Sequence, residues 1–278
     1  MIDCSVVIAS LGTRDSINSI VESLLAQVLL PRELVIVIPR ENKGVFSTLF
    51  NYSECPIINI YYSSRKGQVP QRIYGFSKSQ SSLVLQLDDD IIIANSKFLL
   101  DLISGFLFIS KEYESNRISV APLIVVTDDK TSKFKRYVGR LFGLNQPKIS
   151  AFGIGGYPSH GYNLECGLIE SEWLPGGVVL SSRDCLNTVD YYPFAGRAYG
   201  EDIIDSILKR KRGIRLFILP KIRVDVVSDD PNVLSFRSLA KEVVVDLYVS
   251  KKINNYIFFI FPILKVFLKA IYFVFRKF

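Results

Sequence analysis

The chain has 278 residues, a net charge of +7 and a hydrophobic fraction of 49%. This length suits one α/β catalytic domain with a short appendage. Basic residues gather at 130–140, 209–215 and the C-terminus, without any zinc-finger, homeodomain-like or RRM-like pattern, so we expect no nucleic-acid partner. The 4 cysteines form no CxxC pair, which argues against a zinc site or disulfide framework and favours the cytoplasm.

Short β-branched segments alternate with helical stretches near the N-terminus. In chain order, the pattern predicts strands at 5–10, 34–39, 57–62 and 83–87, with helices near 15–29 and 70–79. Such alternation is typical of βαβ units, so we expect a mainly parallel sheet flanked by helices.

The second half of the chain has a less regular pattern. Residues 130–172 are rich in Gly, Tyr and basic residues, which indicates a long loop rather than a second core. Regular structure is expected to resume after Trp173, with a strand at 178–182, a helix near 200–212 and a strand from 215.

An acidic triplet, Asp88, Asp89 and Asp90, directly follows the predicted fourth strand. In an open parallel sheet, ligands bind beyond the carboxyl ends of the strands. Three adjacent carboxylates repel one another unless a cation relieves them, and Mg²⁺ or Mn²⁺ binds both carboxylates and phosphates. The triplet therefore indicates a metal site for a pyrophosphate, with an exposed turn or helix cap as the alternative.

These segments, taken in order, resemble the family-2 glycosyltransferases of the GT-A fold over roughly residues 3–230. The acidic triplet is similar to the family's DxD motif. The stretch from Ala9 to Arg14 is similar to its nucleotide-contacting turn, and Gly67 to Gly75 resembles its G-x-x-x-A-R-N-x-G segment. The resemblance implies an α/β fold of the GT-A class, which is Rossmann-like and has a central, mostly parallel sheet flanked by helices. Among the family, it points to the enzymes of bacterial surface-polysaccharide synthesis.

The resemblance also implies which residues bind the nucleotide-sugar donor and the divalent cation, Mn²⁺ or Mg²⁺. The donor residues are Ser10, Leu11, Gly12, Arg14, Arg65, Gln71, Arg72, Asp88 and Asp89, with Arg72 approaching the phosphates. The metal ligands are Asp88, Asp90 and, where many members have a His, Asp225. The chain has Ile38-Pro39-Arg40 after the second strand, where many members carry a base-reading Asp, so uridine recognition is not implied.

A second acidic pair, Glu201 and Asp202, opens the helix predicted near 200–212 and resembles the family's ED motif. By itself, such a pair is typical of a helix N-terminus, where the macrodipole favours acids. Inverting sugar transfer needs a carboxylate that removes the proton of the acceptor hydroxyl. The resemblance assigns this role to Asp202, with Glu201 beside it. Trp173 either stacks on an acceptor sugar or packs in the core.

The C-terminal segment 253–278 is apolar and aromatic, with Lys265, Lys269 and Arg276 on one helical face. Its length also suits a transmembrane helix, but a basic stripe is typical of an amphipathic helix on an anionic membrane surface. Packing on the protein's own core is the alternative. We therefore expect a GT-A domain at 1–230, with a donor half at about 1–125 and an acceptor half at about 126–230, and a C-terminal amphipathic helical segment at 231–278 that associates with the membrane.

The resemblance implies a lipid-linked glycan acceptor in bacterial O-antigen or capsule synthesis, at the inner face of the cytoplasmic membrane. Two other functions stay open. A sugar nucleotidyltransferase also uses a Rossmann-like sheet and metal carboxylates, but it usually needs a Gly-rich phosphate loop, and the turn at 10–14 has a single Gly. A non-catalytic membrane-associated sugar-binding module predicts no metal-dependent donor turnover.

Overall fold

The computed structural model describes residues 2–13, 15–126, 149–152, 158–160, 168–194, 198–226, 243–245, 247–249 and 251. The chain divides into two compact units, one of residues 1–129 with 164–227 and one of residues 130–163 with 228–278. The expected domains at 1–230 and 231–278 stay a prediction. The expectation of a single long loop at 130–172 is wrong, because this stretch is divided between the two units and contains three short strands.

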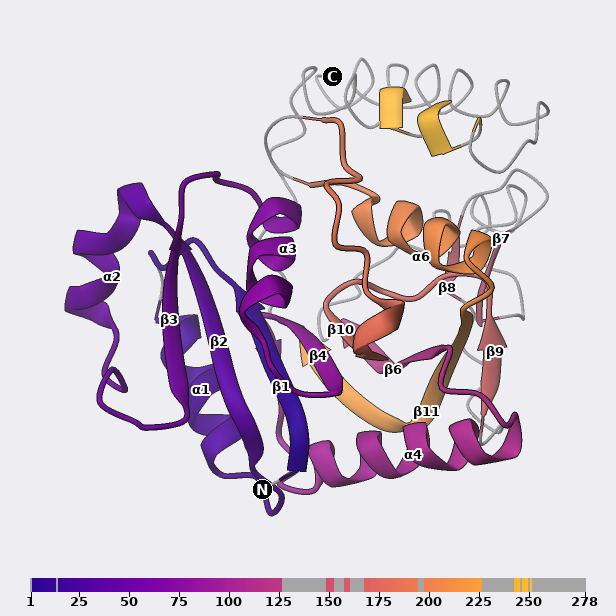
Figure 1. Ribbon diagram of the computed structural model, residues 1–278, viewed down its shortest axis with the longest axis horizontal. Helices are drawn as coiled ribbons and strands as arrows, with labels where there is room; N and C mark the ends of the chain where they lie inside the picture. The colour runs from indigo at the N-terminus through magenta and orange to yellow at the C-terminus, as the bar shows by residue number, and fades with distance from the viewer. Residues whose placement is uncertain are drawn as a thin grey trace, which may run out of the picture. The chain divides into compact units, whose positions relative to one another are not determined.

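A mixed β-sheet forms the centre of the first unit (Figure 1), with the strand order β3-β2-β1-β4-β10-β6-β11-β5. Its first four strands are parallel and match the four predicted from the sequence. They are β1 (Ile2–Ala9), β2 (Pro31–Pro39), β3 (Ile58–Ser63) and β4 (Leu83–Asp88). Their carboxyl ends therefore lie at one edge of the sheet, where ligands bind in such folds.

The other half of the sheet is antiparallel in part. The strand β10 (Val178–Ser182) runs antiparallel to both β4 and β6 (Ile118–Val126), whereas β6 runs parallel to β11 (Arg215–Val226). Two short strands, β5 (Ile91–Ile92) and β9 (Ile169–Ser171), pair antiparallel with β11. In the second unit, β7 (Ile149–Phe152) and β8 (Pro158–His160) form a separate antiparallel pair.

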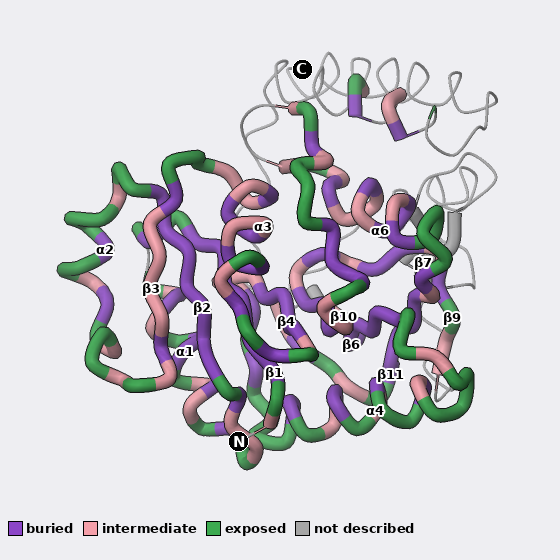
Figure 2. Tube along the Cα trace, viewed as in Figure 1, coloured by how far each residue is buried: buried purple, intermediate pink, exposed green. Residues whose placement is uncertain are grey.

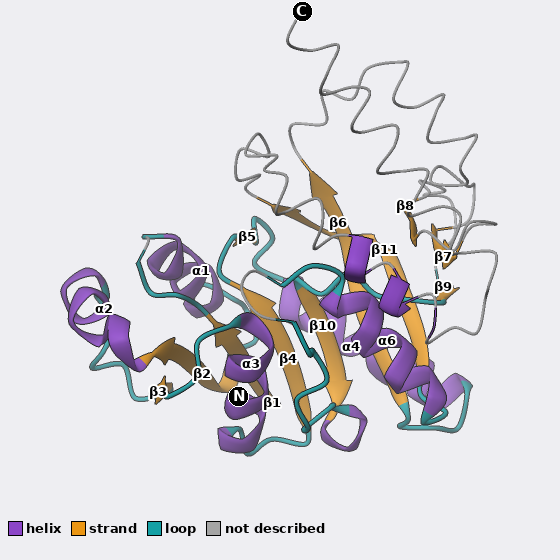
Figure 3. Ribbon diagram, turned by 90° about the horizontal axis from the view of Figure 1, so that it is seen from above, coloured by secondary structure: helices purple, strands orange, loops and turns teal. Residues whose placement is uncertain are grey.

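Helices cover both faces of the sheet in the first unit. The helices α1 (Ser16–Leu25), α2 (Lys43–Leu49) and α4 (Phe98–Glu112) share a hydrophobic core with one face. The helix α3 (Gln68–Lys78) packs on the other face, and Figure 3 shows α1 and α3 on opposite sides of β1 and β2. The helix α6 (Glu201–Lys211) contacts Ser181 of β10. Strand residues alternate between the two faces, and Leu180, next to Ser181, joins the core beneath α4. The helix α6 therefore lies on the same face as α3.

Two 3-10 turns, η1 (Arg40–Asn42) and η2 (Arg183–Cys185), follow β2 and β10.

The parallel strands are apolar along nearly their whole length because both faces of the sheet are covered. In β2, residues 34–38 are fully buried (Figure 2). The sequence did not predict α4 or β6. In α4 the apolar residues continue around the helix, with Leu107 and Phe108 exposed, so the period that marks an amphipathic helix is weak.

Within the described residues, no helix is both long enough and apolar enough to cross a membrane. The segment 253–278 lies outside them, so its association with a membrane stays a prediction.

Candidate active site

The acidic triplet and the turn after β1 meet at the carboxyl edge of the parallel strands. Asp88 is the last residue of β4, and the three aspartates are all partly buried. The Ser10 hydroxyl donates a hydrogen bond to the Asp89 carboxylate, and the backbone N–H of Gly12 donates to Ser10 Oγ at 2.9 Å. The structure therefore brings together two of the segments that the sequence assigned to the donor.

The turn after β1 needs a glycine at position 12. Gly12 has φ +65, and a Cβ on it would lie 2.9 Å from the ring of Phe46 and 3.0 Å from Ile38. The preceding Leu11 is 47% exposed, so its side chain is accessible at this turn. Arg14 lies outside the described residues.

Gln71 supports the same turn from inside the protein. Its side chain is 1% exposed, and its amide donates to the carbonyl oxygens of Ser10 and Val37 at 2.8 Å each. Its amide oxygen accepts a hydrogen bond from the backbone N–H of Gly67 at 3.1 Å. Gln71 therefore shapes the turn, and its direct contact with the donor stays a prediction.

Arg72 joins the two acidic motifs. Its side chain is 2% exposed, and its guanidinium lies 2.6 Å from Asp88 Oδ1 and 3.3 Å from Glu201 Oε1. Burial by itself lowers the pKa of Arg72, but the charges of Asp88 and Glu201 outweigh it and raise that pKa above its ordinary value. Arg72 therefore carries a permanent positive charge between the strand end and the start of α6. The structure gives this side chain two carboxylate partners, and its contact with the donor phosphates stays a prediction.

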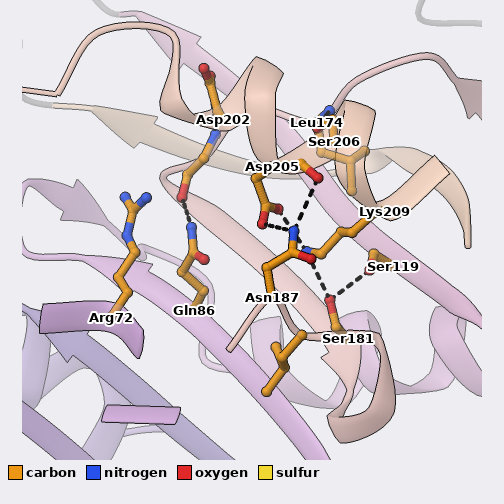
Figure 4. Close-up of polar contacts among 12 residues, drawn as sticks. Arg72, Gln86, Ser119, Leu174, Ser181, Asn187, Asp202, Asp205, Ser206 and Lys209 are labelled. Carbon is orange, nitrogen blue, oxygen red and sulfur yellow. Dashed lines mark hydrogen bonds and ion pairs between the residues drawn. The ribbon is translucent and has the colours of Figure 1, made fainter. Parts of the chain in front are cut away.

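A pair of glycines lets the two motifs approach each other. The backbone N–H of Asp88 donates to the carbonyl of Gly177 at 2.9 Å, and the N–H of Gly176 lies 3.4 Å from Asp202 Oδ2. The amide of Gln86 donates to the Gly176 carbonyl at 2.5 Å (Figure 4). A Cβ on Gly176 would lie only 2.9 Å from Cβ of Asp202, so a side chain there would push the acid away.

Asp202 and Glu201 have different surroundings. Glu201 is 8% exposed and paired with Arg72, whereas Asp202 is partly buried and its carboxylate accepts hydrogen bonds from the backbone N–H groups of Ile203 and Gly176. Burial, followed by the charge of Glu201, raises the pKa of Asp202 from 3.8 to about 7, although these N–H groups lower it. A carboxylate with such a pKa suits a general base near neutral pH.

The carboxylates fit a divalent cation only in part. Across the described ranges, no three His, Cys, Asp or Glu side chains gather as a ligand group, so the expected set of Asp88, Asp90 and Asp225 is not assembled. Asp225 is held in β11 opposite Ile92 of β5, whereas Asp90 lies in the turn before β5. Mg²⁺ and Mn²⁺ are commonly bound by one or two carboxylates together with substrate phosphates, and Asp88 and Asp90 suit that arrangement.

Two other predicted side chains have clear places. Trp173 is 2% exposed, so it belongs to the core and cannot stack on an acceptor sugar. Arg65 is an exposed side chain that forms an ion pair with Asp190 at 2.5 Å. Gln68 was not predicted as a site residue, although its amide donates to Asp88 Oδ2 at 3.0 Å. Its position one helical turn before Arg72 was the available signal, because residues four apart share a helix face.

No family model and no curated protein matches the sequence. Solved structures of glycosyltransferases do match the fold. GalNAc-T7 with UDP, GalNAc and Mn²⁺ gives a TM-score of 0.60 at 17% identity over 89% of this chain and 47% of its own. Residues 1–349 of Staphylococcus aureus TarS with UDP-GlcNAc give a TM-score of 0.57 at 15% identity, and the match covers 91% of this chain and 67% of the TarS chain. The Pyrobaculum calidifontis mannosyltransferase PcManGT with GDP-Man and Mn²⁺ gives a TM-score of 0.60 at 13% identity, and the match covers 91% of this chain and 64% of the PcManGT chain.

The chain spans about half the length of the GalNAc-T7 chain that it matches. At these identities the likeness concerns the fold, which is the GT-A fold with a mixed central sheet flanked by helices, as the resemblance predicted.

Proposed function

We propose that the chain is an inverting, metal-dependent glycosyltransferase that moves a sugar from a nucleoside-diphosphate donor to an acceptor hydroxyl. The observation that carries this proposal is the Arg72 bridge, with contacts of 2.6 Å to Asp88 and 3.3 Å to Glu201. It holds a strand-end acidic motif and a helix-start acidic pair in one site. Proteins of the same fold whose structures contain UDP-GlcNAc, GDP-Man or Mn²⁺ support the substrate and metal classes.

The donor half of this reaction is assigned to the carboxyl edge of the sheet. Asp88 and Asp90 are the proposed metal ligands, with Asp225 as a further candidate, and the metal when bound neutralises charge on the leaving diphosphate. The turn of Ser10 to Gly12 is proposed to bind the nucleotide, together with Arg14, Arg65 and Asp89. Arg72 would serve this half through Asp88, since its guanidinium already contacts that carboxylate.

The acceptor half is assigned to the start of α6. Asp202 would take the proton of the acceptor hydroxyl as its oxygen attacks the anomeric carbon and the bond from that carbon to the diphosphate breaks. The proton ends on Asp202, and the electron pair of the broken bond leaves with the nucleoside diphosphate. Glu201 is engaged with Arg72, which favours Asp202 as the base.

For the acceptor, we propose a lipid-linked glycan of a bacterial O-antigen or capsule pathway at the inner face of the cytoplasmic membrane. The apolar, basic segment 231–278 would hold the protein on anionic lipid. Cosedimentation with phosphatidylglycerol vesicles, but not with phosphatidylcholine vesicles, is the expected result. Equal binding to both, or to neither, contradicts this part of the proposal.

The direct test is donor hydrolysis by the purified protein with UDP-, GDP- and dTDP-sugars in Mn²⁺, Mg²⁺ or EDTA. We expect one nucleoside diphosphate to be released only with metal. No release and no nucleotide binding would favour the sugar-binding module, whereas formation of a nucleotide-sugar from a nucleoside triphosphate and a sugar 1-phosphate would favour the nucleotidyltransferase.

The base is tested separately with Asp202→Asn. We expect this variant to lose on the order of 100-fold or more in transfer while it retains donor binding. The matched control is Glu112→Gln, which removes an exposed acid at the end of α4. Near-normal transfer by Asp202→Asn rules out its role as the base.

A further inference from the structure

Lys209 belongs to the basic stretch 209–215, yet the structure buries it. Its side chain is 4% exposed, whereas Lys211 of the same helix is exposed. Its Nζ lies 2.9 Å from Asp205 Oδ2 and 3.5 Å from Ser181 Oγ, and Figure 4 shows it pointing between these two side chains. A buried ammonium is costly unless it is paired and hydrogen-bonded, so these contacts are what allow Lys209 to be buried.

The network around Lys209 extends into the sheet and into the loop after β10. On the sheet, Ser181 of β10 lies 2.6 Å from Ser119 Oγ of β6. On the loop, Asn187 donates to Asp205 Oδ1 at 2.7 Å and accepts a hydrogen bond from Arg212 at 3.0 Å. One face of α6 is therefore tied to two strands and to a loop by directional bonds.

The same helix face carries the proposed base. Asp202, Asp205 and Lys209 are spaced by three and four residues, which places them in a row along α6. Between them, Ser206 Oγ accepts a hydrogen bond from the backbone N–H of Leu174, just before the two glycines of the site. Any rotation or sliding of α6 would therefore move Asp202 relative to those glycines.

Stability alone does not account for this network, because replacing a buried ion pair by apolar residues of similar size is often neutral or stabilising. The directional hydrogen bonds of the network instead restrict α6 to one position and one rotation about its axis. Reacting groups need such precision, since a displacement of about 1 Å can lower a rate by about 100-fold.

We propose that Asp205 and Lys209 are positioning residues, which fix α6 so that Asp202 faces the acceptor hydroxyl. This inference rests on the proposed glycosyltransferase function. Neither residue needs to touch a substrate, so their loss should lower kcat and leave donor binding unchanged.

The test compares the full chain with Lys209→Met, the double variant Asp205→Asn/Lys209→Met, and Lys211→Met as a matched control on the exposed side. For Lys209→Met we expect a fall in kcat of about 10- to 100-fold with the donor Kd within about two-fold. The double variant should regain the thermal stability that Lys209→Met loses, because no unpaired carboxylate remains, but it should not regain kcat. Lys211→Met should behave as the parent chain.

A merely structural role gives a different result: kcat per folded molecule would return together with stability in the double variant. That outcome overturns the proposal, as does a kcat that is normal in Lys209→Met. If Lys209→Met does not fold, the double variant and Ser181→Ala carry the same comparison. A parent chain that turns over no donor overturns the glycosyltransferase proposal and this role with it, whereas an active parent with unaffected variants overturns this role alone.

Discussion

Arg72 and Lys209 are two buried cations whose carboxylate partners lie at different distances along the sequence. The Arg72 side chain is 2% exposed and contacts two carboxylates, one of them 129 residues away in the sequence. The Lys209 side chain is 4% exposed and pairs with an acid four residues earlier in its own helix. A guanidinium presents a planar fork that can serve two carboxylates, whereas an ammonium is a compact charge. Arg72 thus joins two distant motifs, and Lys209 orients one helix.

Arg72→Met should have the largest effect on stability, because it leaves both Asp88 and Glu201 without their counter-charge. We expect the free energy of unfolding to fall on the order of 3–5 kcal/mol, measured by urea denaturation. Arg72→Lys retains the charge but lacks the fork, so it should recover only part of that loss.

The control for this prediction is an exposed pair elsewhere in the chain. Arg32 lies 3.3 Å from Asp3, and both side chains are more than half exposed, at 55% and 52%. Arg32→Met should therefore change the free energy of unfolding by less than about 0.5 kcal/mol. An equally small change for Arg72→Met would contradict the view that it holds the two motifs together.

Gly176→Ala tests whether the two motifs need to approach so closely. The added Cβ would lie 2.9 Å from Cβ of Asp202 and 3.4 Å from Glu201 Oε1, so we expect a loss on the order of 1–3 kcal/mol in stability together with a lower transfer rate. Gly44 in α2 has no atom within 4 Å of its added Cβ, so Gly44→Ala should instead stabilise the protein by about 0.5–1 kcal/mol. Equal effects of the two substitutions would show that the close approach is unimportant.

The pH dependence of stability tests the surroundings of Asp202. Because its pKa is about 7 in the folded protein and 3.8 as the ordinary value, the folded state holds a proton between these pH values that the unfolded state has lost. Stability due to this group therefore falls as pH rises from about 4 to 7. Relative to the parent chain, Asp202→Asn should gain stability as the pH rises from 4.5 to 8.5, by up to roughly 3 kcal/mol in urea denaturation. A difference independent of pH would contradict this assignment.

The parallel half of the sheet and the two acidic motifs were predictable from the sequence, because buried strands are short apolar runs and a strand end marks the ligand edge. Arg72 was also identified as a site residue, and its contact with phosphates stays a prediction. Its two carboxylate partners lie at the end of β4 and at the start of α6, 16 and 129 residues away in the sequence, and no local pattern encodes such long-range contacts.

The burial of Lys209 and Trp173 was also not predictable from the sequence. Lys209 stands in a run of basic residues, and only the position of α6 on the sheet decides that it faces Ser181 while Lys211 faces solvent. Trp173 could equally have lined a pocket, and its burial follows from the packing of the segment before β10.

The smallest effect is expected for the ion pair between Arg65 and Asp190, which connects the loop after β3 with the loop after β10. Arg65 is 65% exposed, and exposed pairs contribute less than about 1 kcal/mol even at a contact of 2.5 Å. Asp190→Asn should therefore leave the urea midpoint almost unchanged. The substitution also removes the carboxylate that pairs with Arg65, a proposed donor ligand. Donor binding, measured by calorimetry, should therefore tighten by at most about five-fold at low salt and by less at high salt. A large loss of stability in this variant would show that an exposed ion pair can stabilise the fold as much as the buried ion pairs of Arg72 and Lys209. The proposed difference between exposed and buried ion pairs would then be wrong.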